Sequence, residues 1–176
     1  MLYETDMQLR PDGASGLLVS SLEAFNEYQR HKAWVWEHQA ITRATFSAGD
    51  AVIGRAFEQI RHEVMTQKRD LAELKQKVTE MRQKMRAGHA VPADSFDLKQ
   101  SLGGIIDVEF IVQYFVLANA HQHEVLTQNI GNIALLSQLA DLGILDKHQA
   151  DAVAHAYLDF RKRQHALKLQ GHDKAR

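Results

Sequence analysis

Apolar residues recur every three or four positions through most of the chain, and this spacing places them on one face of an α-helix. Four stretches show it, with the apolar positions Val52, Ile53, Ala56, Phe57, Ile60 and Val64; Leu71, Leu74, Val78, Met81 and Met85; Ile130, Ile133, Leu136 and Leu139; and Val153, Ala154, Tyr157 and Leu158. The pattern predicts a bundle of about five helices joined by short loops.

Polar residues that cap helices mark where several of these helices begin. A capping side chain stands just before the apolar stripe, and in three cases a glutamate or glutamine follows three residues later. The residues are Asp50 after Gly49, Asp70 with Glu73, Asp146 with Gln149, and Ser20 with Glu23. The last pair predicts a helix from Leu22 that carries Phe25 and Tyr28 and continues toward Trp34, Trp36 and His38.

Residues 105–117 form the most apolar stretch of the chain. Asp107, Glu109 and Gln113 interrupt it, and it is shorter than the roughly 20 residues that span a membrane. We therefore expect a buried helix at the centre of the bundle and no membrane partner. Glycines at 103 and 104 would let a loop approach closely before this helix starts.

The first twenty residues follow a different pattern. Residues 2–9, which end before Arg10 and Pro11, alternate roughly between apolar and polar positions, and residues 17–21 form a second short apolar stretch. Between them lies PDGASG, which has the composition of a loop. Two short strands ahead of the helices are predicted, so the fold class is mainly α with a short β segment in front.

Composition narrows the possible functions. The chain has 176 residues, a formal net charge of −1 and no cysteine. A disulfide framework, a thiol nucleophile and a cysteine zinc site are thereby excluded, and a reducing cytoplasm is the natural compartment. We find neither a signal peptide pattern nor the glycine-rich motifs of common nucleotide cradles and serine hydrolases.

Two groups of polar residues have ordinary explanations. Lys75, Lys77, Arg82, Lys84 and Arg86 alternate with Glu73 and Glu80 and lack an aromatic platform, so a solvated helix face is favoured over a nucleic-acid patch. The ten histidines, with His121, His123 and Glu124 or His172 and Asp173 as the densest groups, lack metal-ligand spacing and are interpreted as scattered surface residues.

Asp6 is the one residue of the first predicted strand with a possible chemical role. A strand carboxylate followed by Arg10 could hold a divalent metal while the arginine binds phosphate. An exposed carboxylate without a function is the simpler explanation, and spacing alone favours it.

Longer segments resemble a known family. They are YETDMQLRPDGASGLLVSSLEAFNEYQ, AWVWEHQAITRA with the Gly-Asp that follows, VTEMRQKMR and FDLKQSLGGIIDVEFIVQYFVL. In this order they resemble the bacterial bifunctional glutamine synthetase adenylyltransferase/adenylyl-removing enzymes, almost throughout the chain. EHQAITRA after paired tryptophans is similar to the C-terminal, adenylylating half of that much longer protein.

The resemblance implies the transfer of AMP from ATP to a tyrosine of glutamine synthetase, with Mg²⁺ as cofactor. Asp6 matches the third metal-binding aspartate of the family, and the G-S-D-x-D element with the first two is absent from the sequence. We therefore expect a fragment that is inactive by itself. Arg10 and Lys99 match positions expected to contact the nucleotide, although Gln8 and Thr45 stand where the family has arginines.

The resemblance also implies a domain organisation and partners. Residues 1–48 would be the C-terminal part of a nucleotidyltransferase domain, and residues 49–176 an α-helical bundle domain. For the GGIIDVEF motif at 103–110, a structural docking role is favoured over substrate contact. The alternative function is a helical protein-binding module that docks glutamine synthetase or a PII-type signal protein. A nucleic-acid partner is not expected.

Overall fold

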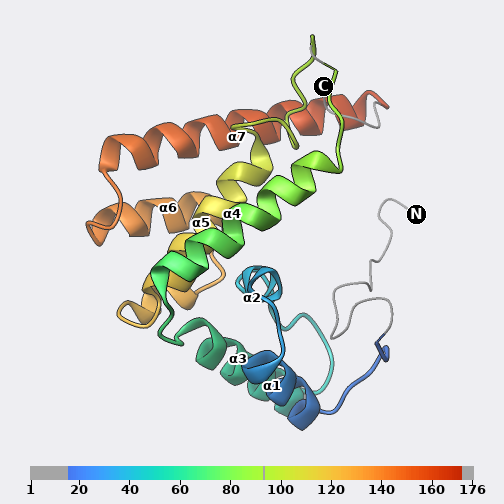
Figure 1. Cartoon of the computed structure of the whole chain (residues 1–176), viewed down its shortest axis with the longest axis vertical. Coiled ribbons are helices and arrows are strands. Elements are labelled where there is room, and N and C mark those ends of the chain that lie inside the picture. The colour runs from blue at the N-terminus through green and yellow to red at the C-terminus, as the bar shows by residue number, and fades with distance from the viewer. Residues whose placement is uncertain (1–15, 93, 172–176) are drawn as a thin grey trace.

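The computed structural model describes residues 16–92 and 94–171, and the regular elements among these residues are all helices (Figure 1). The elements are α1 (Leu22–His31), α2 (Val35–Ile41), α3 (Ala51–Met65), α4 (Leu71–Ala87), α5 (Ile105–Asn119), the short 3₁₀-helix η2 (Glu124–Thr127), α6 (Asn132–Asp141) and α7 (Lys147–Leu169). The helical class is therefore confirmed, with more helices than the predicted five.

The predicted β segment does not appear in the described part of the chain. Residues 17–20 form a bend and irregular backbone, and α1 starts shortly after them. The first predicted strand, residues 2–9, lies outside the described residues. Leu17 and Val19 are each 82% exposed, so this stretch lacks the covering partner that a short apolar strand requires.

Helix α5 occupies the centre of the bundle, as its apolar sequence predicted. It packs against α2, α4, α6 and α7. Its side chains at Ile105, Val112, Val116 and Leu117 are nearly inaccessible to water. No helix among the described residues is both long and apolar enough to cross a membrane.

The remaining helices lie on either side of α5 (Figure 1). Helices α6 and α7 pack against each other at one end of the molecule, and α1 packs against α3 at the other end. Helix α2 lies between these parts and contacts α3, α4 and α5. The short α2 therefore connects the α1–α3 end to the rest of the bundle.

Most predicted helix starts are confirmed by their capping bonds. Asp50 accepts from Val52 N at 2.6 Å, Asp70 from Glu73 N at 2.8 Å, and Asp146 from Gln149 N at 3.0 Å. The first helix begins at Leu22 as expected, but its cap is Ser21, which accepts from Ala24 N at 3.1 Å. The predicted role of Ser20 was therefore wrong by one residue.

The apolar stripes are confirmed in the middle of each helix and wrong at several ends. Ile60, Val64, Leu74 and Val78 are buried. The exposed exceptions are Val52, Ile53, Leu71, Ile130, Ile133 and Leu158. Val52, Ile53 and Leu71 lie in the first turn of α3 or α4. Periodicity places them on the apolar face, but they are exposed because no described element covers that turn. Helical spacing predicts which face is apolar, and the packing of neighbours decides how far it is buried.

Candidate functional site

Of the three predicted site residues, only Lys99 can be located. Asp6 and Arg10 lie outside the described residues, so their metal and nucleotide roles stay predictions. Lys99 is exposed in the loop between α4 and α5. Its position is defined by the turn that contains it.

That turn is organised by the buried carboxylate of Asp97. Asp97 Oδ1 accepts from the N–H groups of Lys99 and Gln100, both at 2.9 Å, and the Ser101 hydroxyl accepts from Asp97 N at 2.9 Å. The carbonyl of Lys99 accepts from Ile106 N at 3.2 Å. The backbone of Lys99 is therefore tied to the start of α5, while its ammonium group faces the solvent.

The two glycines before α5 have different structural roles. Gly103 has a φ of +80°, a conformation that side chains disfavour. Gly104 is the N-cap of α5, and a Cβ there would lie 2.8 Å from Leu98 O and 3.0 Å from Ser101 O. The expected close approach of loop and helix is thus confirmed at Gly104.

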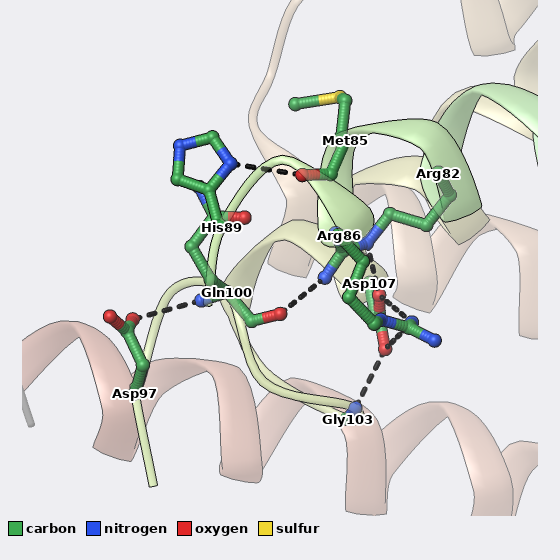
Figure 2. A network of polar contacts seen from close by, with 8 residues as sticks. All are labelled: Arg82, Met85, Arg86, His89, Asp97, Gln100, Gly103 and Asp107. Carbon is green, nitrogen blue, oxygen red and sulfur yellow. Dashed lines mark hydrogen bonds and ion pairs between the residues drawn. The ribbon is translucent and has the colours of Figure 1, made fainter. Parts of the chain in front are cut away.

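Asp107, in the first turn of α5, is the centre of a polar network (Figure 2). Its carboxylate accepts from Arg82 Nε at 2.5 Å, from Arg86 Nη2 at 3.3 Å and from Gly103 N at 2.6 Å. Arg82 also donates from Nη2 to Gln100 O at 2.8 Å. The network joins α4, the 97–104 loop and α5.

This network corrects the interpretation of α4 as a uniformly solvated basic face. Arg82 is only 6% exposed, whereas Lys75, Lys77 and Lys84 are exposed. The sequence did contain a signal, because Arg82 follows Leu74 and Val78 at intervals of four residues and so shares their face. Its partner Asp107 is 25 residues away, and helical periodicity does not connect the two residues.

Glu109, two residues after Asp107, makes contacts on the opposite side of α5. Arg43 Nη1 lies 3.0 Å from Glu109 Oε2, and the Tyr157 hydroxyl donates to Oε1 at 3.2 Å. Asn132 Nδ2 donates to the Tyr157 oxygen at 2.9 Å, and burial is the main cause of the raised pKa of Tyr157. Residues two apart lie about 200° apart around a helix, so the two acids of GGIIDVEF connect α5 to different neighbours.

The EHQAITRA segment, which covers most of α2, buries polar side chains rather than presenting them. Glu37 accepts from the Tyr28 hydroxyl at 2.9 Å and from Trp34 N at 2.8 Å. Gln39 Nε2 donates to Gln113 Oε1 on α5 at 3.0 Å. These bonds link α2 to α1 and to the central helix.

His38 corrects the interpretation of every histidine as a surface residue. It is 6% exposed, with Nε2 2.8 Å from Gln29 O and Nδ1 3.1 Å from Arg69 Nη1. An arginine can only donate, so Nδ1 accepts and the ring is neutral with its proton on Nε2. Burial, and secondarily Arg69, lower the pKa of His38.

The end of α2 is held by a second buried cation, Arg61. Arg61 donates from Nε to Ile41 O at 3.0 Å and from Nη2 to Thr42 O at 2.8 Å. These carbonyls are the groups that a helix C-terminus leaves without intrahelical partners. The EHQAITRA segment is therefore fixed at both of its ends.

The described part of the chain holds no group of three or more His, Asp or Glu residues arranged to bind a metal ion. His62 Nε2 lies 3.4 Å from Glu124 Oε2, and this contact is an ion pair only when the histidine is protonated. The described residues thus form no metal site of this kind by themselves.

Two family models match different parts of the chain. The model described as "Glutamate-ammonia ligase adenylyltransferase" matches residues 1–60. The model described as "GlnD PII-uridylyltransferase" matches residues 72–175, which include α4 to α7.

Curated relatives match nearly the whole chain. The protein named bifunctional glutamine synthetase adenylyltransferase/adenylyl-removing enzyme in Nitrosomonas europaea is 54% identical to this chain, and the match covers 97% of this chain and 18% of that protein. The protein of the same name in Aromatoleum aromaticum is 52% identical, and the match again covers 97% of this chain and 18% of that protein. The protein of that name in Burkholderia mallei is 49% identical over 99% of this chain and 20% of its own length. The chain thus spans about a fifth of the length of these relatives. At this identity over its length, the chain belongs to the family of bifunctional glutamine synthetase adenylyltransferase/adenylyl-removing enzymes.

Proposed function

We propose that this chain is part of an enzyme that transfers AMP from ATP to a tyrosine of glutamine synthetase and so regulates nitrogen assimilation. The observation that carries the proposal is the identity of 49% to 54% with enzymes of that name over almost the whole chain. Residues 1–48 would complete a nucleotidyltransferase domain of the C-terminal, adenylylating half. Residues 49–176 would form the helical domain beside it.

In this proposal Asp6 and Arg10 act at the reaction centre. Asp6 would hold Mg²⁺, which supplies charge stabilisation to the attacking and leaving oxygens of an in-line displacement. Arg10 would bind the triphosphate. Lys99, whose backbone is fixed by Asp97 while its side chain is exposed, would contact the nucleotide from the helical side.

Contacts inside the bundle favour a positioning role, rather than a chemical one, for the helical part in this reaction. The acids of GGIIDVEF and the polar residues of EHQAITRA form bonds within the bundle. They therefore hold α2 and α5 in fixed positions within the bundle. We propose that these two motifs position the helical domain and take no part in the chemistry.

We further propose that a polypeptide of residues 1–176 alone does not adenylylate glutamine synthetase. Within these residues the family resemblance supplies one of the three carboxylates that would hold the metal ions, so metal affinity should be very low. The test is transfer of labelled AMP from ATP to purified glutamine synthetase, with the Nitrosomonas europaea enzyme as positive control. Incorporation above the level of a protein-free reaction would refute the proposal.

A second candidate function is a protein-binding module that docks glutamine synthetase or a PII-type signal protein. It is favoured by the match of residues 72–175 to a model whose description names a PII-uridylyltransferase. Calorimetric titration of the chain with each protein separates the two functions. A binding module retains affinity for at least one of them, whereas a purely catalytic segment shows no saturable binding to either.

A further inference from the structure

A groove with a volume of about 570 Å³ lies between α4 and α5. Its α5 wall is made of Phe110, Ile111, Tyr114 and Phe115, which follow one another at helical spacing. Ile111 is 43% exposed although it belongs to the central helix. Helix α5, which the bundle covers on most faces, therefore presents a row of large apolar side chains to the solvent here.

The α4 wall of the groove is cationic. Lys75, Arg82 and Arg86 line it. Asp107 is the one carboxylate among the residues that line it, and both arginines already bind this group. Formal charges of three cations and one anion leave the groove with a net charge of +2.

The two arginines have more donors than the neighbouring residues satisfy. In the described part of the chain, Arg82 Nη1 and Arg86 Nε are enclosed and have no hydrogen-bond acceptor. The side chain of Arg86 is 38% exposed, so part of its guanidinium group is accessible from the solvent. An additional carboxylate brought to this wall would therefore meet unbalanced positive charge.

From this combination we infer that the α4–α5 groove is a docking site for an acidic amphipathic helix of a partner protein. Large aliphatic side chains at every third or fourth position would cover the aromatic row of α5. Glutamates or aspartates along the edge of that helix would face Lys75 and Arg86. The inference does not depend on AMP transfer, because none of these residues has a role in the proposed reaction.

A designed peptide tests the groove directly. The probe is a fluorescein-labelled helix of about 18 residues, five turns, with leucines on one face and glutamates along both edges. Its twin carries lysines in place of the glutamates. We expect saturable binding of the glutamate peptide to the whole chain in fluorescence anisotropy, weakened by salt, and markedly weaker binding of the lysine twin. In methyl NMR spectra the signals of Ile111 should shift and those of Ile133 on α6 should not.

Matched variants locate the site. Lys75→Glu should weaken binding of the glutamate peptide about fivefold, whereas Lys84→Glu, the same change at an exposed position of α4 outside the groove, should leave it unchanged. Ile111→Ser should weaken it about tenfold, and Ile133→Ser, at a similarly exposed isoleucine, should not. Circular dichroism spectra establish that each variant is folded.

Three results would overturn the inference. They are equal binding of the lysine twin, equal effects of Lys75→Glu and Lys84→Glu, and unshifted Ile111 signals at saturating peptide. Self-association of the chain that Ile111→Ser abolishes in sedimentation would assign the groove to a second copy instead, and would also reject an acidic helix as its occupant.

Discussion

Arg82 is a charged residue at a core position of α4, and its contacts explain why that position tolerates a charge. Burying a cation is costly unless carboxylates or carbonyls replace the water that it loses. Asp107 and Gln100 O supply these acceptors, and Gly103 N donates to the far oxygen of the same carboxylate. A single acidic side chain thus compensates the arginine and holds the loop that precedes its own helix.

Replacing Asp107 by asparagine should destabilise the chain by about 3 kcal/mol, because Arg82 would remain buried without an anion. Chemical denaturation with urea measures the change in the free energy of unfolding. Glu80→Gln removes one carboxylate from an exposed position of α4 and should change the same quantity by less than about 0.5 kcal/mol. Equal effects of the two variants would show that the Asp107 network contributes no more than a surface charge.

His38 gives the chain a specific dependence of stability on pH. Its pKa in the folded chain is lowered from 6.5, mainly by burial and also by Arg69, so the unfolded chain binds more protons below pH 6.5. Stability from this group is therefore complete above pH 6.5 and decreases as the pH falls below that value. Urea unfolding between about pH 5 and pH 7.5 should show this slope.

Two histidine variants attribute the slope to its source. His38→Gln should flatten the decrease below pH 6.5, because it removes the group that titrates. His148→Gln, at an exposed position, should retain it. A slope of the same size in the His38 variant would assign the pH dependence to other residues.

At the scale of single elements, the junction between the 97–104 loop and α5 depends on steric contacts. Gly104 starts α5 at a point where the carbonyls of Leu98 and Ser101 leave no room for a side chain. Close contact with backbone atoms cannot be relieved by a rotamer change, so the loop itself would have to move. The exposed position of Lys99 is a consequence of this tight turn.

Gly104→Ala should destabilise the chain by about 2 kcal/mol, as expected for overpacking. Gly103→Ala, where space is free but φ is +80°, should cost about 1 kcal/mol. Gly88→Ala is the control, since φ there is −77° and its nearest neighbour would be 3.6 Å away. Gly88→Ala should be neutral or slightly stabilising. Thermal unfolding of the three variants, each compared with the unchanged chain, measures these differences in stability. If Gly104→Ala proved as mild as the control, close packing would not explain the glycine.

The sequence was sufficient to predict features that depend on neighbours along the chain. The caps at Asp50, Asp70 and Asp146 involve bonds across two or three residues, and the apolar character of α5 lies within one segment. The buried polar pairs could not be predicted in this way, because their partners are 74 residues apart for Gln39 and Gln113 and 31 for His38 and Arg69. Periodicity identifies an unusual polar residue but not the residue that balances its charge.

At the scale of the whole molecule, α2 connects the two ends of the bundle through polar contacts as well as apolar ones. Its residues supply acceptors to Arg61 and to Arg69, and Arg43 just after it pairs with Glu109. Helix α2 belongs by sequence to the part that we propose to complete a nucleotidyltransferase domain. The two proposed domains would therefore share an interface that contains one buried and several partly buried charged side chains.

A polypeptide of residues 49–176 should consequently lack cooperative folding, whereas residues 16–176 should retain it. Starting at residue 49 removes both carbonyls that accept from Arg61 and the imidazole that accepts from Arg69. It also removes the cover that α1 and α2 give to α3, α4 and α5, and the loss of that apolar burial approaches the total stability of a domain this size. Thermal melting followed by circular dichroism compares the two polypeptides. A cooperative transition of residues 49–176 within a few degrees of the longer one would show that the bundle folds without α2, and that α2 acts there only as a connection.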